Sequence, residues 1–464
     1  MGPFDRAPFI VIWETTRACA LACVHCRAAA IPQRDPRELT TDEGQRLMDR
    51  VTAFGDPPPL LVLTGGDPLR RPDIVDLVAY GARHGLSVSL TPSGTAAASE
   101  ARLRALRDAG LARLAVSLDG GTAEVHDAFR GVVGSHRHTL TIMERARALG
   151  LPLQINTTVC RRTVKELPGL AHQVEAFGVV LWALFFLIPV GRAEADEALG
   201  AGEIETVLEW AAGLTGRYPF GVKTTEAPHF HRVLAHRRQL SGGVPTRSLE
   251  RETDRIRRAD RAVTDGNGFV FVDHTGNICP SGFLPLVAGN VRHDDLVDVY
   301  RDSPLFAALR DPARLGGRCG RCEYRGLCGG SRARAFAASG DLLAEDPGCA
   351  WQPGARPAAV IAGGSDAAPV SESDVRQALA TVLDPELGMS IVDLGLVYDV
   401  RIRNGAVAIT MTLTAPGCPI HDVMPEWVRT AVLRVPGVEA VDVTLTFEPP
   451  WTPDRMAPRP GRVR

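Results

Sequence analysis

Residues 19–26 read Cys-Ala-Leu-Ala-Cys-Val-His-Cys and follow shortly after the apolar run Phe9–Trp13. Structural zinc sites usually have four protein ligands. Three cysteines without an evident fourth suit a [4Fe–4S] cluster whose remaining iron stays open to another ligand. A zinc site or a redox-active disulfide loop is the alternative that these residues leave open.

The chain has 464 residues, of which 45% are hydrophobic, and its formal net charge is −2. This length predicts about two to four domains, and the balanced charge argues against a dedicated nucleic-acid binder. The longest apolar run, Val179–Ile188, is shorter than the roughly 18 residues of a membrane helix, and the N-terminus shows no signal peptide. We therefore expect a cytoplasmic protein without a membrane partner, in which ten cysteines indicate metal binding rather than disulfides.

Apolar runs alternate with helical patterns between residues 9 and 188. A capping box, Thr40-x-x-Glu43, marks the start of one helix, which we expect to end near Phe54. Regular alternation of strand and helix predicts an α/β fold with a parallel sheet, here a partial (β/α)6 barrel of the TIM type. The six expected strands are Phe9–Trp13, Leu60–Leu63, Leu86–Leu90, Leu111–Leu118, Leu153–Val159 and Val179–Ile188.

The remaining chain changes character several times. Residues 191–262 should be mainly helical, and the stretch Arg232–Arg261 favours a solvated mixed-charge helix over an anion site. A hairpin then joins Phe269–Val272 to Ile278-Cys279. Residues 352–373 are rich in Pro, Ala, Gly and Ser and predict a flexible linker. The last part, 374–456, predicts a small α/β domain with a helix at Val375–Val382, strands at Leu396–Ile402 and Val407–Leu413, a helix at Pro425–Leu433 and a strand at Val441–Phe447.

Small polar residues follow the expected barrel strands, at the edge where active sites of such sheets lie. The second strand ends in Gly65-Gly66-Asp67-Pro68, a turn that exposes backbone carbonyls. Ser93, Ser117 and Asn156 stand at the ends of later strands. Together with the cysteine loop, these groups predict one polar rim.

In these features the chain resembles the radical SAM superfamily, whose [4Fe–4S] cluster is held by a CxxxCxxC loop after the first strand. The resemblance implies that Cys19, Cys23 and Cys26 hold the cluster, with His25 in the aromatic position before the last cysteine. It implies S-adenosylmethionine (SAM) as cofactor, cleaved by one electron to methionine and a 5′-deoxyadenosyl radical that abstracts hydrogen from a substrate. It also implies an electron donor such as a flavodoxin or ferredoxin.

The same resemblance implies which residues bind SAM. The Gly65-Gly66-Asp67 turn is similar to the family's second signature, which holds the SAM amino group. Asp67 stands where Glu is usual, and we expect its shorter carboxylate to keep that contact. Arg130 is similar to an arginine that meets the SAM carboxylate in one large subgroup. Further polar positions near SAM are matched by Ser93, Ser117 and Asn156.

A second set of four cysteines offers a closed ligand shell: Cys319, Cys322, Cys328 and Cys349. On spacing alone, a zinc-ribbon-like site is an alternative. The pattern is similar to the SPASM extension, which follows radical SAM cores and binds auxiliary [4Fe–4S] clusters. Positions 332 and 294, where that extension would provide further cysteines, are Arg332 and Asp294, so we expect one auxiliary cluster. Cys279 either faces the substrate or is a buried strand cysteine, and we expect Cys160 in the core.

The resemblance divides the first part of the chain into a radical SAM core at 8–215 and an auxiliary-cluster region at 216–351. Together with the stretch Ile188–Arg192, it favours the branch of haem-biosynthesis decarboxylases, although the same extension serves enzymes that mature ribosomal peptides. It therefore implies a tetrapyrrole side chain or a peptide as the substrate.

Residues 374–456 resemble the small iron–sulfur assembly domains of the PaaD and SufT-like kind, through motifs such as Asp384-Pro385-Glu386 and Thr414–Pro419. The resemblance implies a domain that aids cluster assembly with the iron–sulfur assembly machinery. Cys418 would be its exposed thiol, with Asp384 and Glu386 as oxygen neighbours, and a Cys418 that only packs its turn is the alternative. For the whole chain, the alternative to an enzyme is a non-catalytic cluster carrier or scaffold.

Overall fold

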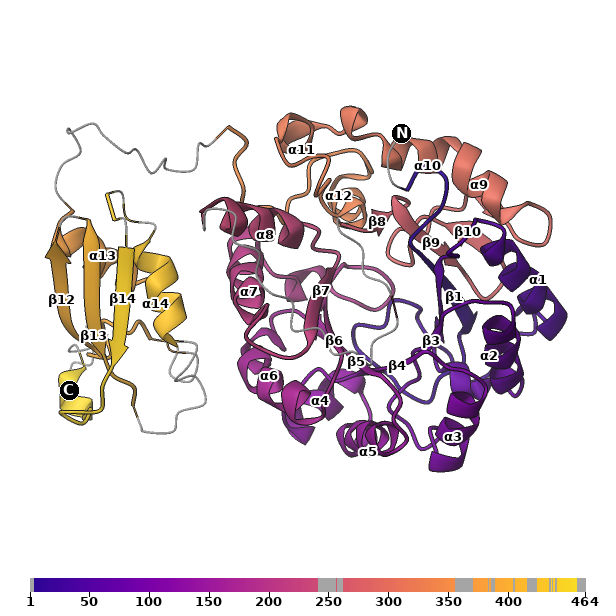
Figure 1. Cartoon of the computed structure of the whole chain (residues 1–464), viewed down its shortest axis with the longest axis horizontal. Helices are drawn as coiled ribbons and strands as arrows, with labels where there is room; N and C mark the ends of the chain where they lie inside the picture. The colour runs from indigo at the N-terminus through magenta and orange to yellow at the C-terminus, as the bar shows by residue number, and fades with distance from the viewer. Residues whose placement is uncertain are drawn as a thin grey trace. The chain divides into compact units, whose positions relative to one another are not determined.

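The computed structural model of the chain describes residues 4–240, 256, 262–354, 370–382, 384, 389–403, 405–414, 424–433, 435, 437–438 and 440–456. The chain divides into two compact units, Met1–Gly354 and Ala355–Arg464 (Figure 1). Most of the expected linker and of the arginine-rich stretch beyond residue 240 lies outside the described residues. Within the described part of the chain, no helix is both long and apolar enough to cross a membrane.

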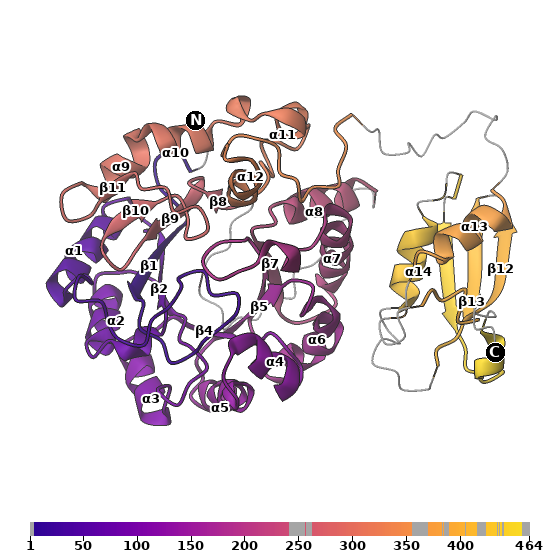
Figure 2. The ribbon, with the colours of Figure 1, turned by 180° about the vertical axis from the view of Figure 1, so that it is seen from behind.

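Seven consecutive strands of the first unit form a parallel sheet in which each strand pairs with the next. Figures 1 and 2 show the sheet curving inside a ring of helices. The predicted α/β partial barrel is thereby confirmed, with one strand more than expected. The strands are β1 (Ile10–Thr16), β2 (Leu60–Gly65), β3 (Val88–Leu90), β4 (Arg113–Ser117), β5 (Leu153–Val159), β6 (Leu181–Phe186) and β7 (Gly221–Thr225).

The additional strand, β7, lies in the segment that the sequence predicts to be mainly helical. It reads Gly-Val-Lys-Thr-Thr, and every one of its residues is half-buried. The strand stands at the edge of the sheet, next to β6. A strand with neither an apolar run nor an apolar–polar alternation gives no periodic signal, which is why the sequence does not reveal it.

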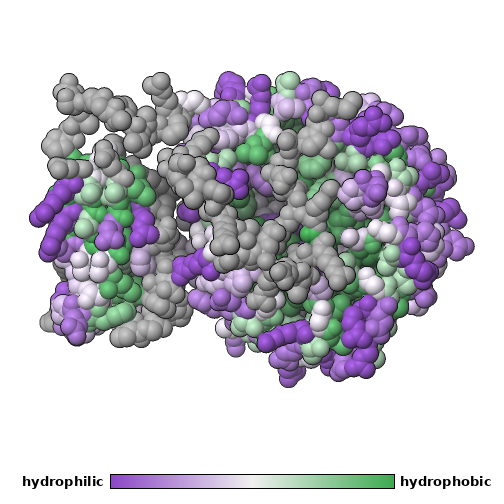
Figure 3. Space-filling view, viewed as in Figure 1, coloured by the Kyte–Doolittle hydropathy of each residue, from purple (hydrophilic) through white to green (hydrophobic). Residues whose placement is uncertain are grey.

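The connecting helices pack on the outer face of the sheet. Helix α1 begins at the predicted capping box: the Glu43 N–H donates to Thr40 Oγ1 at 3.2 Å, and the Thr40 N–H donates to the Glu43 carboxylate at 2.8 Å. Trp13 and Trp182 are fully buried in the core, and Figure 3 shows hydrophilic residues at the outer rim of this unit. The helices are α1 (Thr41–Thr52), α2 (Ile74–Arg83), α3 (Glu100–Asp108), α4 (Ala123–Arg130), α5 (Ser135–Ala148), α6 (Leu167–Ala176), α7 (Ala201–Leu214) and α8 (His229–Leu240), with short turns η1 (Pro68–Arg70), η2 (Val164–Glu166) and η3 (Ala195–Glu197).

Residues 262–354 extend the sheet on the β1 side. Strand β9 (Gly268–Val272) pairs in parallel with β1, and β10 (Asn277–Cys279) pairs antiparallel with β9. The predicted hairpin is thereby confirmed, and the pairing of β9 with β1 brings the extension to the strand that precedes the first cysteine loop. The other elements are β8 (Thr264–Asp265), β11 (Gly289–Asn290), α9 (Leu296–Asp302), α10 (Pro304–Arg310), η4 (Pro312–Arg314), α11 (Gly317–Arg321) and α12 (Arg332–Ser339).

The second unit has its own three-stranded sheet and its own core. Strand β13 pairs antiparallel with β12 and parallel with β14. Val375, Ile409 and Val428 are among the fully buried side chains that join its helices to the sheet. The predicted elements are present: α13 (Glu372–Leu379), β12 (Val397–Arg403), β13 (Ala406–Met411), α14 (Met424–Val432) and β14 (Ala440–Leu445), followed by η5 (Pro453–Arg455).

Candidate radical SAM site

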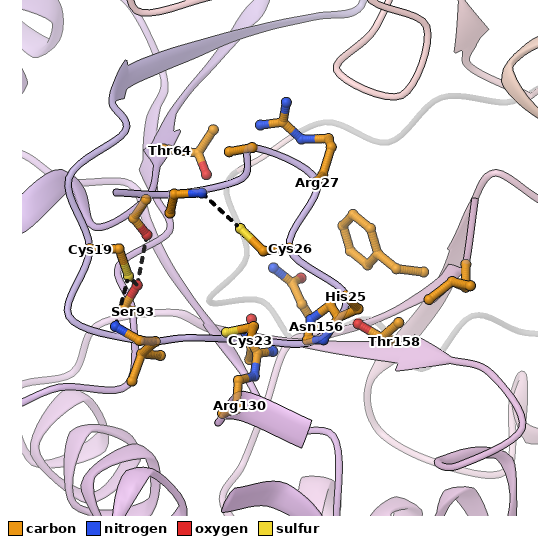
Figure 4. Close-up of a pocket in the computed structure, with 18 of the residues that line it drawn as sticks. Cys19, Cys23, His25, Cys26, Arg27, Thr64, Ser93, Arg130, Asn156 and Thr158 are labelled. Atoms are coloured by element: carbon orange, nitrogen blue, oxygen red, sulfur yellow. Dashed lines mark hydrogen bonds between the residues drawn. The ribbon is translucent and has the colours of Figure 1, made fainter. Parts of the chain in front are cut away.

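A cavity of about 200 Å³ opens at the carboxyl ends of the barrel strands. Figure 4 shows the sulfur atoms of the first cysteine loop spaced around this cavity. Nearly all of the site residues predicted for this rim lie in its wall. They are Cys19, Cys23, His25, Cys26, Gly65, Gly66, Ser93, Ser117, Arg130 and Asn156.

Backbone donors reach two of the three thiols. The Leu21 N–H donates to Cys19 Sγ at 3.3 Å, and the Ala30 N–H donates to Cys26 Sγ at 3.5 Å. Hydrogen bonds of this kind to sulfur are part of how proteins tune iron–sulfur clusters. In the described residues, no group of three His, Cys, Asp or Glu side chains is arranged to chelate a single metal ion. Three thiols around one cavity, two of which accept backbone hydrogen bonds, fit a cubane, whose ligands bind different irons.

Arg130, the last residue of α4, brings a positive charge to the third thiol. Its Nη1 lies 3.9 Å from Cys23 Sγ, and its Nε donates to Asp119 Oδ2 at 2.7 Å. Burial raises the pKa of Asp119, but the positive charge of Arg130 outweighs that rise, so the pKa of Asp119 is below its usual value. The His25 ring stacks on Phe129 with a centroid distance of 4.0 Å. Burial lowers the pKa of His25 to about 3, so its imidazole is neutral at pH 7.

The glycine turn after β2 fits against the start of the cysteine loop because it has no side chains. A Cβ atom at Gly65 would lie 2.2 Å from the backbone oxygen of Thr16. One at Gly66 would lie 2.6 Å from the backbone oxygens of Arg17 and Ala18. The Gly66 N–H also donates to Thr16 O at 2.8 Å. The turn is therefore held against the loop, and its backbone faces the cavity.

Asp67 does not have the position that the resemblance implies. Its side chain is fully buried and is absent from the described wall of the cavity. The carboxylate accepts the Leu69 N–H at 3.1 Å, which caps η1, and the Thr95 hydroxyl at 3.0 Å. Burial raises the pKa of Asp67, and these donors act against that rise. The Asp67 side chain thus stabilises the turn on the side away from the cavity, while Gly65 and Gly66 line the cavity.

The other polar residues of the rim are themselves oriented by hydrogen bonds. Ser93 Oγ donates to Gly66 O at 2.7 Å and lies 3.2 Å from Cys19 Sγ, so it joins the glycine turn to the first thiol. Asn156 Oδ1 accepts from Gln154 Nε2 at 2.7 Å. This bond fixes the direction of the Asn156 amide, whose nitrogen then faces away from Gln154.

Arg192, which sequence reasoning did not assign to the site, fastens the cysteine loop from the β6 side. Its N–H donates to Cys26 O at 3.0 Å, and its Nε donates to Cys23 O at 2.9 Å. A Cβ at the preceding Gly191 would lie 2.4 Å from Cys26 O. The glycine–arginine pair after a strand is the sequence signal that could have indicated this contact.

Glu14, buried in β1, ties the loop to the extension. Arg27 Nη2 donates to its Oε1 at 2.9 Å, and His274 Nδ1 lies 3.1 Å from its Oε2. Burial raises the pKa of Glu14, but Arg27 and His274 outweigh that rise, so the pKa is below its usual value. Because Arg27 also lines the cavity, this ion pair links the wall of the site to residues 262–354. The sequence signal that could have indicated this contact is an acidic residue, Glu14, within a strand that is otherwise mostly apolar.

The four cysteines of the second set line a smaller cavity of about 30 Å³. The Gly330 N–H donates to Cys328 Sγ at 3.4 Å, and Arg332 Nη2 lies 3.6 Å from Cys319 Sγ. Arg332 is buried, and it occupies a position where the resembling extension often has cysteine. At this position the chain therefore has a positively charged side chain close to Cys319 Sγ instead of a further cysteine.

Arg232 lies beside this second cavity, so the prediction of a solvated helix is wrong for this residue. Its side chain is only 2% exposed. The guanidinium pairs with Glu205 and lies over the Trp351 ring, 5.1 Å from the centroid. The surrounding acids in the sequence suggested a solvated face, whereas the packing of α8 against α7 and Trp351 buries the charge.

The remaining cysteines and acids have these positions. Cys160 is fully buried in a cluster with Phe129 and Leu187, as predicted. Cys279 is buried on β10 and is absent from the described walls of both cavities, which agrees with the reading as a strand cysteine. Asp384 is buried in the second unit, so its carboxylate is not exposed to bind a metal ion. Cys418 and Glu386 lie outside the described residues.

Residues 13–174 match the Radical SAM superfamily, and residues 372–444 match the family named Iron-sulfur cluster assembly protein. An AdoMet-dependent heme synthase of Methanosarcina barkeri is 38% identical over 357 residues, which are 76% of this chain and 99% of that protein. The chain therefore belongs to the radical SAM superfamily, and it is a radical SAM enzyme. Membership implies a [4Fe–4S] cluster and SAM.

Two further similarities are more distant. The mycofactocin maturase MftC of Mycobacterium ulcerans is 32% identical over 352 residues, which are 74% of this chain and 88% of that protein. The crystal structure of SuiB from Streptococcus suis bound to S-adenosylmethionine aligns with a TM-score of 0.58 at 15% identity, covering 75% of this chain and 78% of SuiB. The SuiB likeness supports the fold alone.

Proposed function

We propose that this enzyme acts on the carboxylate side chains of a tetrapyrrole. Relatives named AdoMet-dependent heme synthase support haem synthesis as the setting of this activity. The observation that carries the proposal is the 38% identity over 99% of such a protein. Peptide maturation is the second candidate, supported by the 32% identity with the mycofactocin maturase.

In this proposal Cys19, Cys23 and Cys26 hold the [4Fe–4S] cluster. When bound, the cluster and SAM supply a 5′-deoxyadenosyl radical, fed by an electron donor such as a flavodoxin or ferredoxin. The protein's part is to hold ligands in place and to keep water out. Ser93 and Arg130 support two of the thiols, at 3.2 and 3.9 Å from Cys19 and Cys23 Sγ.

The cavity wall offers SAM both polar and apolar contacts. Arg130 provides a cation for its carboxylate, and the backbone of Gly65 and Gly66 provides acceptors for its amino group. Ser117 and Asn156 provide hydrogen bonds further around the rim, beside the neutral ring of His25. An apolar side made of Phe185, Phe186, Leu187, Ile188 and Phe283 excludes water from the reacting centre.

We further propose one auxiliary [4Fe–4S] cluster on Cys319, Cys322, Cys328 and Cys349, within a region at 216–351 that follows a core at 8–215. All four cysteines line one cavity, and Arg232 is buried beside it. A closed shell of four thiolates leaves no iron open for SAM. Cleavage of SAM therefore belongs to the first cluster.

The experiment that tests the function uses the anaerobically reconstituted full chain with SAM, a reductant and iron coproporphyrin III, the compound in the name of another relative. We expect 5′-deoxyadenosine together with a porphyrin that has lost CO2, both detected by mass spectrometry. Formation of 5′-deoxyadenosine without any change to the porphyrin would contradict the tetrapyrrole and favour a peptide. Absence of 5′-deoxyadenosine under all conditions would favour the non-catalytic cluster carrier.

For the second unit we propose that it aids cluster installation and takes no part in radical chemistry. Its one cysteine, Cys418, cannot hold a cubane alone, but an accessible thiolate can take iron or a cluster transiently. The composition of residues 352–373 predicts a flexible tether, and a flexible tether of about 20 residues has an r.m.s. span on the order of 25 Å. Such a tether would keep the donor at a high effective concentration.

Deletion of residues 360–464 should therefore leave SAM cleavage per reconstituted cluster unchanged, while the iron content of protein purified from cells falls. The first unit, Met1–Gly354, keeps its own core in this truncation. The Cys418→Ala variant of the full chain should show the same two results, measured by iron analysis and 5′-deoxyadenosine assay. A truncated protein that arrives fully loaded but does not turn over its substrate would show that the unit binds substrate instead.

A further inference from the structure

Lys223 stands in the interior row of the barrel that also carries two residues of the SAM cavity. In the parallel register, Ser117 lies opposite Asn156, Asn156 opposite Ala183, and Ala183 opposite Lys223. Residues in register on neighbouring strands point to the same face of a sheet. Because Ser117 and Asn156 line the cavity, the side chain of Lys223 also points into the barrel.

Lys223 is not among the described residues that line the cavity, but it lies close to that wall. Strands β5 and β7 are separated by β6 alone, so the Cα atoms of Asn156 and Lys223 are about 10 Å apart, two strand spacings. The half-buried state of Lys223 leaves part of its side chain accessible. A ligand that occupies the barrel beside Asn156 therefore comes within reach of the ammonium group.

Among the described residues, the ammonium group of Lys223 has no acidic partner, because no ion pair or hydrogen bond there joins it to a carboxylate. The charge that acts on it is that of Arg113, a buried cation on β4. Burial, together with Arg113, lowers the pKa of Lys223 to about 8. A buried ammonium group without an anionic partner costs free energy, and a ligand carboxylate beside it would remove that cost.

The choice of residue is itself unusual. Of the 52 basic residues, Lys165 and Lys223 are the two lysines, and all others are arginine. Lys165 is exposed in η2, at the surface. Lysine offers a compact, strongly hydrated charge, whereas arginine offers a wide planar fork. A compact ammonium group can pair with a carboxylate in an enclosed space that would not fit the wider guanidinium group.

We propose that Lys223 binds a carboxylate side chain of the substrate inside the barrel. This inference rests on the proposed tetrapyrrole substrate, whose several carboxylates allow one to be held at Lys223 while another stands at the radical site. The ammonium group pairs with the carboxylate, which gives the buried charge of Lys223 an anionic partner. Lys223 is thus a residue that determines which substrates bind and in which orientation.

The test is equilibrium binding of iron coproporphyrin III and of its tetramethyl ester to the anaerobically reconstituted full chain, followed by absorbance titration. We expect wild-type protein to bind the acid more tightly than the ester. The Lys223→Gln variant should bind the acid on the order of tenfold to hundredfold more weakly, the range for loss of a charged hydrogen bond. It should bind the ester as wild type does, and Lys223→Arg should restore part of the affinity.

Lys165→Gln removes the other lysine and is the matched control, with wild-type binding of both ligands. Iron content equal to wild type shows that Lys223→Gln keeps its fold and clusters. Equal affinity of wild-type protein for acid and ester overturns the inference without any variant, and so does unchanged acid binding by Lys223→Gln. If wild-type protein binds neither porphyrin, the proposed substrate class itself is wrong and the inference falls with it.

Discussion

A chain in which Cys19, Cys23 and Cys26 are all alanine should form no 5′-deoxyadenosine from SAM and should keep about half of its iron. The reason is that these three thiols are the ones that leave an iron coordination position free for SAM. Wild-type protein should hold about eight irons and eight sulfides, in two cubanes. Iron and sulfide analysis after anaerobic reconstitution, with chromatography of the SAM products, measures both effects.

Two further variants make this result specific. Cys160→Ala removes a buried cysteine that lies in a separate apolar cluster, and it should keep both iron and SAM cleavage. Replacing the four cysteines of the second set should remove the other half of the iron. Retained 5′-deoxyadenosine in the triple variant would contradict the site assignment. Stoichiometric zinc in the wild-type protein would make the second site structural, and about twelve irons would indicate a third cluster.

The barrel could be predicted from the sequence because most of its strands are largely buried and rich in apolar residues. Such strands form clear runs, and β1 to β6 each coincide with one of them. Strand β7 does not, because it lies at an edge and consists of half-buried, mostly polar residues. The pairing of β9 with β1 joins residues that are distant in sequence, and no local pattern encodes such a pairing.

The site residues divide in a similar way. Residues of the cysteine loop and the glycine turn could be found because their types and spacing follow from ligand chemistry. The role of Asp67 could not be found from the sequence, because a carboxylate after a glycine turn can either face a ligand or cap the next turn. In the structure the side chain is buried and caps the next turn. Arg192 and Arg232 act through contacts with the backbone of a distant loop and with a distant ring. Such contacts exist only once the chain has folded.

The Gly66→Ala variant should lose SAM cleavage by on the order of a hundredfold, the cost of misplacing a reacting group by about 1 Å. Its new Cβ would lie 2.6 Å from the backbone oxygens of Arg17 and Ala18. A backbone clash cannot be relieved by a side-chain rotation, so the turn must move away from the cysteine loop. Iron content should fall toward the value of the triple cysteine variant, because the loop loses the support of the Gly66 hydrogen bond to Thr16.

Gly202→Ala is the matched control for this variant. Gly202 lies in helix α7, and a Cβ there would meet nothing within 4 Å. Alanine is favoured over glycine within a helix by about 1 kcal/mol, so this variant should be slightly more stable and equally active. Thermal unfolding separates the two effects: Gly66→Ala protein that unfolds like wild type but has lost its iron has a local defect at the cysteine loop. Wild-type iron and SAM cleavage in Gly66→Ala would show that the turn does not need to touch the loop, and the role of its backbone in the cavity would then be wrong.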